Sequence, residues 1–214
     1  MGPINIREPV NAWTHFVTLI VAFISLPFLI VLTSSSITEM LVVTVYGLSM
    51  VALYGASTLY HWKITTPRKE LLLRRLDHGS INLLIAGSAT PIFYYGLSGV
   101  WRTVMLAVMW GLALFGGVFQ VVFIKAPRWL KTVLYMLLGW VAVIPFPQLM
   151  KTLPRPATVL ILLGGLSYTI GGIVYATKRM NFVPGRFGFH EVFHLFVSVG
   201  TLVHFAAVVV CIQG

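Results

Sequence analysis

The amino-acid sequence predicts an all-α integral membrane protein, a bundle of seven transmembrane helices with a cytoplasmic N-terminus and its C-terminus outside. Two observations predict this class. Apolar residues make up 58% of the 214 residues and charged residues only 9%, whereas a soluble domain carries about 25% charged residues. The apolar residues also fall in seven runs, each long enough to cross a hydrocarbon core of about 30 Å.

Each apolar run is expected to be a helix. Only helices and closed barrels satisfy every backbone polar group in lipid, and the runs lack the alternation of barrel strands. Short loops separate the runs, so residues 1–214 are predicted to form a single transmembrane domain. The predicted spans are residues 13–33, 40–62, 77–98, 102–124, 131–149, 155–177 and 188–212.

Prolines are expected to modify three of these helices. Pro27 and Pro91 fall inside the first and third spans, where a missing N–H and a steric clash bend a helix. Pro145 and Pro147 are expected to loosen the end of the fifth span. The basic stretch 67–75, which opens with a proline, is expected to form a short interfacial helix before the third span.

The basic residues predict the orientation. Twelve of the 15 Lys and Arg residues fall in the N-terminal segment and in the loops after the second, fourth and sixth spans. Positively charged loops stay in the cytoplasm, so this side is expected to face inward. The same placement explains the formal net charge of +10. We expect these residues to contact anionic inner-leaflet headgroups, and nucleic acid is excluded as a partner.

Five of the six histidines are predicted to share the cytoplasmic end with Asp77, the only aspartate. Ionisable groups at membrane depth are costly, so they are candidates for function. His204 is the exception, because it lies 14 residues beyond His190, about 21 Å along a helix. It is expected to pack between helices through a hydrogen bond. The histidines at the cytoplasmic end are His15, His61, His78, His190 and His194.

Three of these histidines form a candidate zinc site. His190 and His194 are four residues apart, so both project from one helix face, where two imidazoles can hold one ion. His61, at the end of the second span, would be the third ligand. Three histidines leave a fourth position open for water, as in catalytic zinc sites.

Asp77 and Ser57 are the candidate catalytic residues beside this site. Asp77 would bind the water, orient a histidine or act as general base; alternatively, it only complements the dipole of the third helix. Ser57 lies one turn deeper than His61, and its alternative role is that of a small residue at a helix contact. His15 and His78 either support the ligands or are plain interfacial residues.

Residues 190–194, HEVFH, also match the H-E-x-x-H pattern of zinc proteases, with Glu191 as base. Those enzymes take a third ligand further along the chain. No Asp or Glu follows Glu191, and Gly200 stands where the extended pattern has its third histidine. A protease would therefore have to use Asp77 or His61 instead.

The chain resembles the bacterial hemolysin III family in three segments. They are STLYHW (57–62), RRLDHGSINLLIAGSATP (74–91) and HEVFH (190–194) followed by LVHF. That family belongs to the superfamily of progestin and adipoQ receptors and alkaline ceramidases, and the resemblance covers essentially the whole chain. It implies a seven-helix bundle in the bacterial plasma membrane, with a zinc ion near the inner leaflet.

Carried over by motif position, the zinc ligands would be His61, His190 and His194, with Asp77 and Ser57 beside the bound water. Glu191 lies outside the shared pattern, so we expect it to be an interfacial charge.

The leading hypothesis is a zinc-dependent hydrolase of a membrane lipid amide or ester, because alkaline ceramidases cleave a lipid amide. Its expected partners are membrane lipids, which would enter through a lateral opening between helices, and its expected role is in membrane lipid homeostasis. The alternative is a non-enzymatic sensor, regulator or membrane-permeabilising, haemolytic protein with a structural zinc. An ion transporter fits less well, because no carboxylate lies near the midplane of a span.

Overall fold

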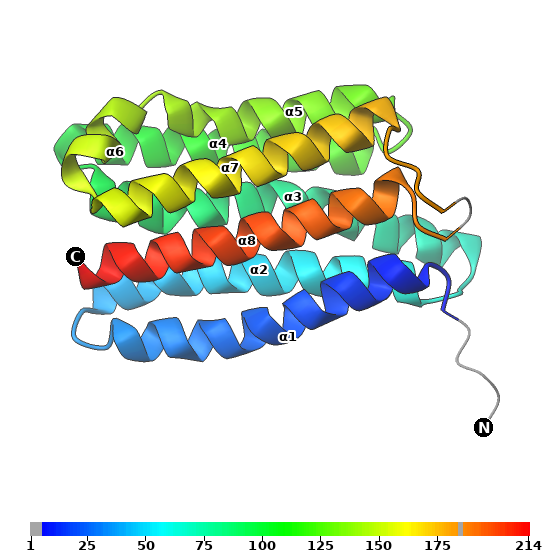
Figure 1. The fold of residues 1–214 in the computed structure, drawn as a ribbon, viewed down its shortest axis with the longest axis horizontal. Helices are drawn as coiled ribbons and strands as arrows, with labels where there is room; N and C mark the ends of the chain where they lie inside the picture. Colours follow the sequence, from blue (N-terminus) through cyan, green and yellow to red (C-terminus); the bar gives the residue numbers. More distant parts are fainter. Residues whose placement is uncertain (1–5, 184–185) are drawn as a thin grey trace.

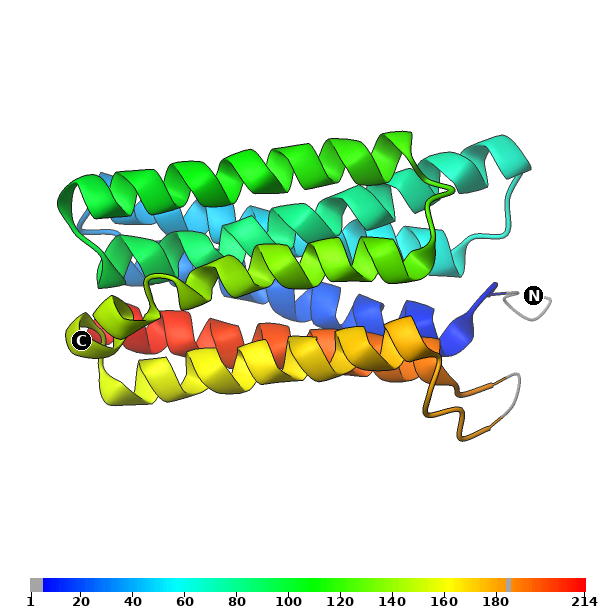
Figure 2. The same ribbon diagram turned by 90° about the horizontal axis from the view of Figure 1, so that it is seen from above.

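The computed structural model describes residues 6–183 and 186–214, and these residues form a bundle of long helices (Figure 1). Helices α1, α2, α3, α4, α7 and α8 lie side by side with the shorter α5, as Figure 2 shows from above. The helices are α1 (Pro9–Leu32), α2 (Ile37–Trp62), α3 (Pro67–Gly96), α4 (Gly99–Val122), α5 (Arg128–Trp140), the 3-10 turn η1 (Val141–Val143), α6 (Phe146–Thr152), α7 (Arg155–Thr177) and α8 (Phe189–Gln213).

Five helices in the described ranges are long and apolar enough to cross a membrane, namely α1, α2, α4, α7 and α8. A sixth crossing is formed if α5 with η1 and the following α6 count as one span bent by 47°. Pro145 lies at this bend and Pro147 follows it. A proline lacks the N–H that would continue the hydrogen-bond ladder, so the helix breaks here, where the sequence predicted loosening.

Helix α3 differs most from its predicted form. The stretch expected as a separate interfacial helix and the third span are one continuous helix of 30 residues, with Pro67 in its first turn. Asp77 therefore lies almost three turns inside a helix instead of at its start. Pro27 and Pro91 lie within α1 and α3 without ending them.

Helix α3 occupies the centre of the bundle, where it packs against α2, α4, α5, α6 and α8. It buries small and polar residues, including Ser80, Asn82, Ser88 and Thr90, and small residues let helices approach closely within a membrane bundle. Because its neighbours are protein and not lipid, α3 does not need the strongly apolar surface of the outer helices. This explains why it lacks the composition of an ordinary membrane span.

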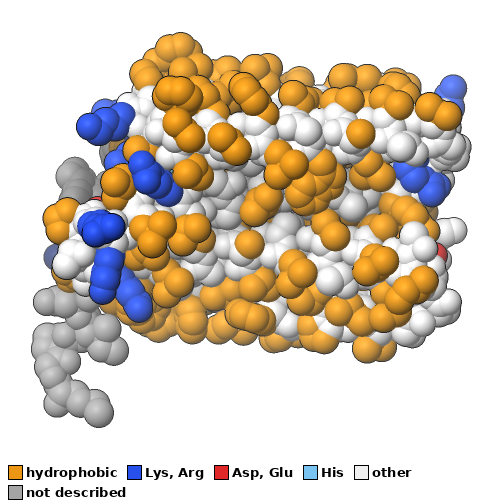
Figure 3. Space-filling model, turned by 180° about the vertical axis from the view of Figure 1, so that it is seen from behind, with side chains coloured by type: hydrophobic (Ala, Val, Ile, Leu, Met, Phe, Trp, Pro, Cys, Tyr) orange, Lys and Arg blue, Asp and Glu red, His pale blue; other side chains and the backbone are white. Residues whose placement is uncertain are grey.

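Large apolar side chains cover the outside of the bundle between its two ends. On the face in Figure 3, hydrophobic side chains extend along the helices, and Lys and Arg gather at the ends. Val31 and Phe115 are 72% and 70% exposed, a pattern that would cause aggregation in water but suits hydrocarbon. The bundle is therefore built to be surrounded by lipid.

Candidate metal centre

The three histidines predicted as zinc ligands meet at one end of the bundle. His61 lies in the last turn of α2, and His190 and His194 lie in the first two turns of α8. One ring nitrogen from each of the three falls within 4.8 Å of the others. We call this end of the bundle, defined by His61, His190 and His194, the histidine end. The spacing of four residues explains the α8 pair, and the packing of the bundle brings in the third ring from α2.

The donor atoms fit a metal ion. Nε2 of His190 and Nε2 of His194 are 3.2 Å apart, and two nitrogens that bind one tetrahedral zinc at 2.0–2.1 Å are separated by about 3.3 to 3.4 Å. Nε2 of His61 is buried and has no hydrogen-bond partner in the described chain. A buried polar atom without a partner is unfavourable. A cation between the three rings would satisfy these nitrogens together.

Glu8 fixes the ring of His61. Its Oε2 lies 2.7 Å from His61 Nδ1 and 3.7 Å from His190 Nδ1. An ionised carboxylate only accepts hydrogen bonds, so Nδ1 of His61 donates and its Nε2 keeps a free lone pair. Burial raises the pKa of Glu8, but the hydrogen bonds from His61 and Asn11 help to lower this pKa to about 2. Glu8 is therefore ionised at neutral pH and orients the His61 ring.

Asn11 connects the N-terminal segment to α8. Its Nδ2 donates to Glu8 Oε2 at 2.9 Å and to Glu191 Oε1 at 3.0 Å, and it lies 3.5 Å from His190 Nδ1. The other oxygen of Glu191 accepts the backbone N–H of Gly188 at 2.8 Å, which caps the start of α8. Both oxygens of Glu191 are thus engaged, which fits a capping role and argues against the base of a protease.

Glu8 and Asn11 were not identified as part of the site from the sequence. A signal was available, because Glu8, Asn11 and His15 are spaced by three and four residues and so lie along one face of a helix. His15 is buried, and its ring centroid lies 3.9 Å from that of His194. Glu8, Asn11 and His15 therefore lie on the side of α1 that faces the three histidines.

The two predicted catalytic residues lie in the same region. Ser57, one turn before His61, is fully buried, and its Oγ has no hydrogen-bond partner in the described chain. Asp77 on α3 is also buried. Ser57, Asp77, His190 and His194 all line one cavity of about 740 Å³. The bundle thus brings a carboxylate and a hydroxyl to the cavity wall that holds two of the three ligands.

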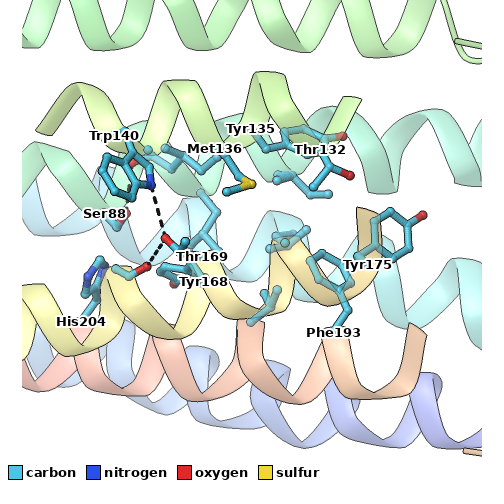
Figure 4. A pocket seen from close by; sticks show the side chains of 18 of the residues that line it. Ser88, Thr132, Tyr135, Met136, Trp140, Tyr168, Thr169, Tyr175, Phe193 and His204 are labelled. Carbon is cyan, nitrogen blue, oxygen red and sulfur yellow. Dashed lines mark hydrogen bonds between the residues drawn. The ribbon is translucent and has the colours of Figure 1, made fainter. Parts of the chain in front are cut away.

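The rest of this cavity is largely apolar. It extends from the histidine end along α3, α5, α7 and α8, and Figure 4 shows part of its wall, with Tyr175 and Phe193 near one end and His204 and Trp140 towards the other. His204 is buried and its Nε2 bonds to the Ile161 carbonyl at 3.1 Å, so its predicted role in helix packing is confirmed. Apolar residues from these four helices and from α4 complete the wall, among them Leu84, Ile85, Ile92, Phe93, Met109, Met136, Leu162 and Val197.

Comparison with known proteins decides the family. The model of a family described as haemolysin-III related matches residues 4–205. The chain belongs to this haemolysin-III-related family. The resemblance found in the sequence is therefore confirmed, and together with the apolar helices it makes the chain a multi-pass protein of the cell membrane.

Individual haemolysin-III relatives match over most of their length. The chain is 34% identical to the hemolysin-3 homolog of Bacillus subtilis (strain 168), over 94% of this chain and 92% of that protein. It is 35% identical to hemolysin-3 of Bacillus cereus, over 94% and 90%. It is also similar to an adiponectin receptor protein of Drosophila melanogaster, with 25% identity over 92% of this chain and 49% of the receptor.

Proposed function

We propose that this haemolysin-III-related protein is a zinc-dependent hydrolase of an amide or ester bond in a membrane lipid. The observation that carries the proposal is the meeting of three histidines with Asp77 and Ser57 at the head of a long, largely apolar cavity. His61, His190 and His194 hold the ion. A zinc ion bound there supplies Lewis acidity, which polarises a carbonyl and acidifies water at neutral pH.

The protein's own residues carry the proton and position the substrate. Asp77 accepts the proton that water loses as it attacks the scissile carbonyl. Ser57 donates its unpaired hydroxyl hydrogen to the oxygen on which negative charge develops. Glu8 keeps the His61 ring in the tautomer whose Nε2 faces the other two histidines. The buried positions of Asp77 and Ser57 exclude competing water.

A lipid can reach the cavity from the side of the bundle. Trp140, Leu162 and Leu166 line the cavity and are each more than half exposed on the outer surface. They border the seam between α5 and α7, which is bridged by a 3.3 Å hydrogen bond from Trp140 Nε1 to Thr169 Oγ1 (Figure 4). An acyl chain enters through this seam from the hydrocarbon core, as the expected lateral opening requires.

The membrane topology belongs to the same proposal. Helix α3 and the bent path of α5 and α6 complete seven spans, and the histidine end faces the cytoplasm with the N-terminus. The support is the charge asymmetry, because 12 of the 15 Lys and Arg residues fall on the side of the N-terminus. The scissile bond then lies just beneath the inner headgroups, where membrane lipids carry their amide and ester linkages.

A second function has its own support. Glu8, Asn11 and the triad connect α1, α2 and α8 at one point, which is also how a structural zinc would brace a sensor, a regulator or a membrane-permeabilising protein. This alternative needs no proton acceptor beside the metal. Replacing Asp77 therefore distinguishes the two functions, because only the hydrolase depends on that carboxylate.

The test combines metal analysis with lipid analysis. Purified wild-type protein is expected to contain zinc, His194→Ala to lose it, and Asp77→Asn to keep it. Cells that express wild type are expected to differ in lipid composition from cells that express Asp77→Asn. Metal-free wild type would end the zinc proposal. Retained zinc with identical lipid profiles would favour the non-enzymatic alternative.

A further inference from the structure

A buried lysine without an acidic partner lies beside the candidate site. Lys131 on α5 is 4% exposed, its Nζ donates to the Ile124 carbonyl at 2.8 Å and it lies 3.4 Å from His78 Nδ1. All ion pairs within 4.0 Å in the described chain use Arg7, His61 or His190 as the cation. A buried charge without a counter-charge is strongly unfavourable, so an anion from outside the chain is expected near Lys131.

Two arginines line the same part of the cavity. Arg128 is half-buried, and its guanidinium lies over the rings of Tyr175 at 5.2 Å and Phe189 at 4.9 Å. Its Nε is buried and has no hydrogen-bond partner in the described residues. Arg74 on α3 lines the cavity beside Asp77 and His78. We call Arg74, Arg128 and Lys131 the cationic mouth of the cavity.

Positive-inside topology alone does not explain this cluster. Lys69, in the first turn of α3, and Lys125, before α5, lie at the same end of the bundle, but they are exposed and do not line the cavity. Lys131, in contrast, is turned into the protein, and Arg128 is held in place by two aromatic rings. Like charges on α3 and α5 repel each other, so an anionic ligand between them would stabilise their convergence on one cavity.

The cationic mouth adjoins the histidine triad. The ring of Tyr175, below the Arg128 guanidinium, lies 5.5 Å from the ring of His190, and Phe189, also below it, precedes His190 in the chain. Beyond the mouth the cavity wall is largely apolar. One ligand can therefore place an anionic group at Arg128 and Lys131, a carbonyl at the triad and an acyl chain in the cavity.

We propose that the cavity binds an amphiphile with an anionic group, either a phosphate or a carboxylate, attached to a long acyl chain. Arg128 and Lys131 hold the anion through charge-assisted hydrogen bonds, and Arg74 strengthens its attraction. If the bound amphiphile is the substrate, the proposal rests on the proposed hydrolase and makes the hydrolysed lipid anionic instead of neutral. Binding of the amphiphile by itself requires neither zinc nor turnover.

The test compares ligands that share one acyl chain but carry or lack an anionic group. Purified full-length protein in neutral detergent is titrated with a lysophosphatidate and with the monoacylglycerol of the same chain. A second pair, a fatty acid and its alcohol, separates a free carboxylate from a headgroup phosphate. At least one anionic ligand is expected to bind about tenfold tighter than its neutral partner, and Arg128→Gln and Lys131→Gln to remove that preference. Lys69→Gln, an exposed lysine at the same end, should retain it.

Several outcomes separate the two proposals. Equal affinity for the anionic and the neutral ligand in both pairs would overturn the cationic mouth. A preference for the anionic ligand that survives in Arg128→Gln and Lys131→Gln would also overturn it, because the preference would then arise at the metal. Arg128→Gln keeps the test valid if Lys131→Gln does not fold. Asp77→Asn is expected to retain the preference. If no lipid is hydrolysed but anionic ligands still bind more tightly, only the hydrolase proposal fails. If neutral lipids are hydrolysed and anionic ligands bind no more tightly, only the cationic-mouth proposal fails.

Discussion

Glu8 and His61 are joined by a 2.7 Å contact between a carboxylate oxygen and Nδ1 of the ring. The contact links the segment before α1 to the last turn of α2, 53 residues apart in sequence. It sets which nitrogen of His61 is free, and so orients the ring for the proposed metal site. Carboxylates that hold metal-binding histidines in this way raise their basicity and fix their rings.

Replacing Glu8 is expected to weaken zinc binding without unfolding the bundle. Glu8→Gln removes the negative charge but keeps a side chain of similar size, so the dissociation constant for zinc should rise about 10- to 100-fold. Competition with a fluorescent chelator measures it. Glu39→Gln is the matched control, because Glu39 lies at the start of α2, at the opposite end. Equal zinc affinity in wild type and Glu8→Gln would refute the orienting role.

Zinc should dissociate on acidification because of the histidines and not because of Glu8. The pKa of Glu8 in the folded protein, about 2, lies below its ordinary value of 4.5. Its stabilising contribution is therefore complete above pH 4.5 and disappears as the pH falls towards 2. Only neutral imidazoles bind metal, so protons compete with zinc for the three rings while Glu8 is still ionised. Zinc content after dialysis should therefore already fall above pH 4.5, and zinc that is fully retained at pH 4.5 and lost only below it would point to Glu8 instead.

Asp77→Asn separates metal binding from chemistry. The amide cannot accept the proton of the attacking water, so hydrolysis should fall at least about 100-fold. Asp77 is not among the three ligands, so zinc content should match wild type. A quantitative lipid hydrolysis assay on zinc-loaded protein measures the first quantity and metal analysis the second. Unchanged hydrolysis would remove Asp77 from the mechanism, whereas zinc loss would make it a metal ligand.

The close packing of α2 against α3 depends on a glycine. A methyl group added at Gly87 would overlap the side chain of Ser49 on α2. Gly87→Ala should therefore lower the free energy of unfolding by about 1 to 3 kcal/mol, measured as a reduced thermal midpoint in detergent. Gly111→Ala on α4 is the control, because nothing lies within 4 Å of its added methyl group. Equal midpoints for the two variants would contradict this account.

Sequence reasoning predicted that the three histidines lie together because the signals that place them are local or topological. The spacing of His190 and His194 indicates a shared helix face, and the alternation of inside and outside loops predicts that His61 lies at the same end. The structure brings the three nitrogens within 4.8 Å of one another. Composition likewise predicted an all-helical membrane protein, and Pro145 indicated the weak point of the fifth span.

The rest could not be predicted because it depends on tertiary contacts. The spacing of Glu8, Asn11 and His15 indicates a shared helix face, but it does not reveal that the partner of Glu8 is His61, which lies on another helix. Helix α3 appeared to begin near Asp77 because hydropathy drops sharply in the stretch before it, but charged residues continue the helix beyond the apolar region. Lys131 was counted as a loop charge, and only the packing around α5 shows that it is buried.

The position of Glu8 has a practical consequence for anyone who purifies this protein. A tag fused before Met1 lies seven residues from Glu8, which orients the ring of His61, whereas Gly214 lies at the opposite end of the bundle (Figure 1). Affinity handles therefore belong on the C-terminus, and a protein purified through an N-terminal handle should be checked for metal content after the handle is removed.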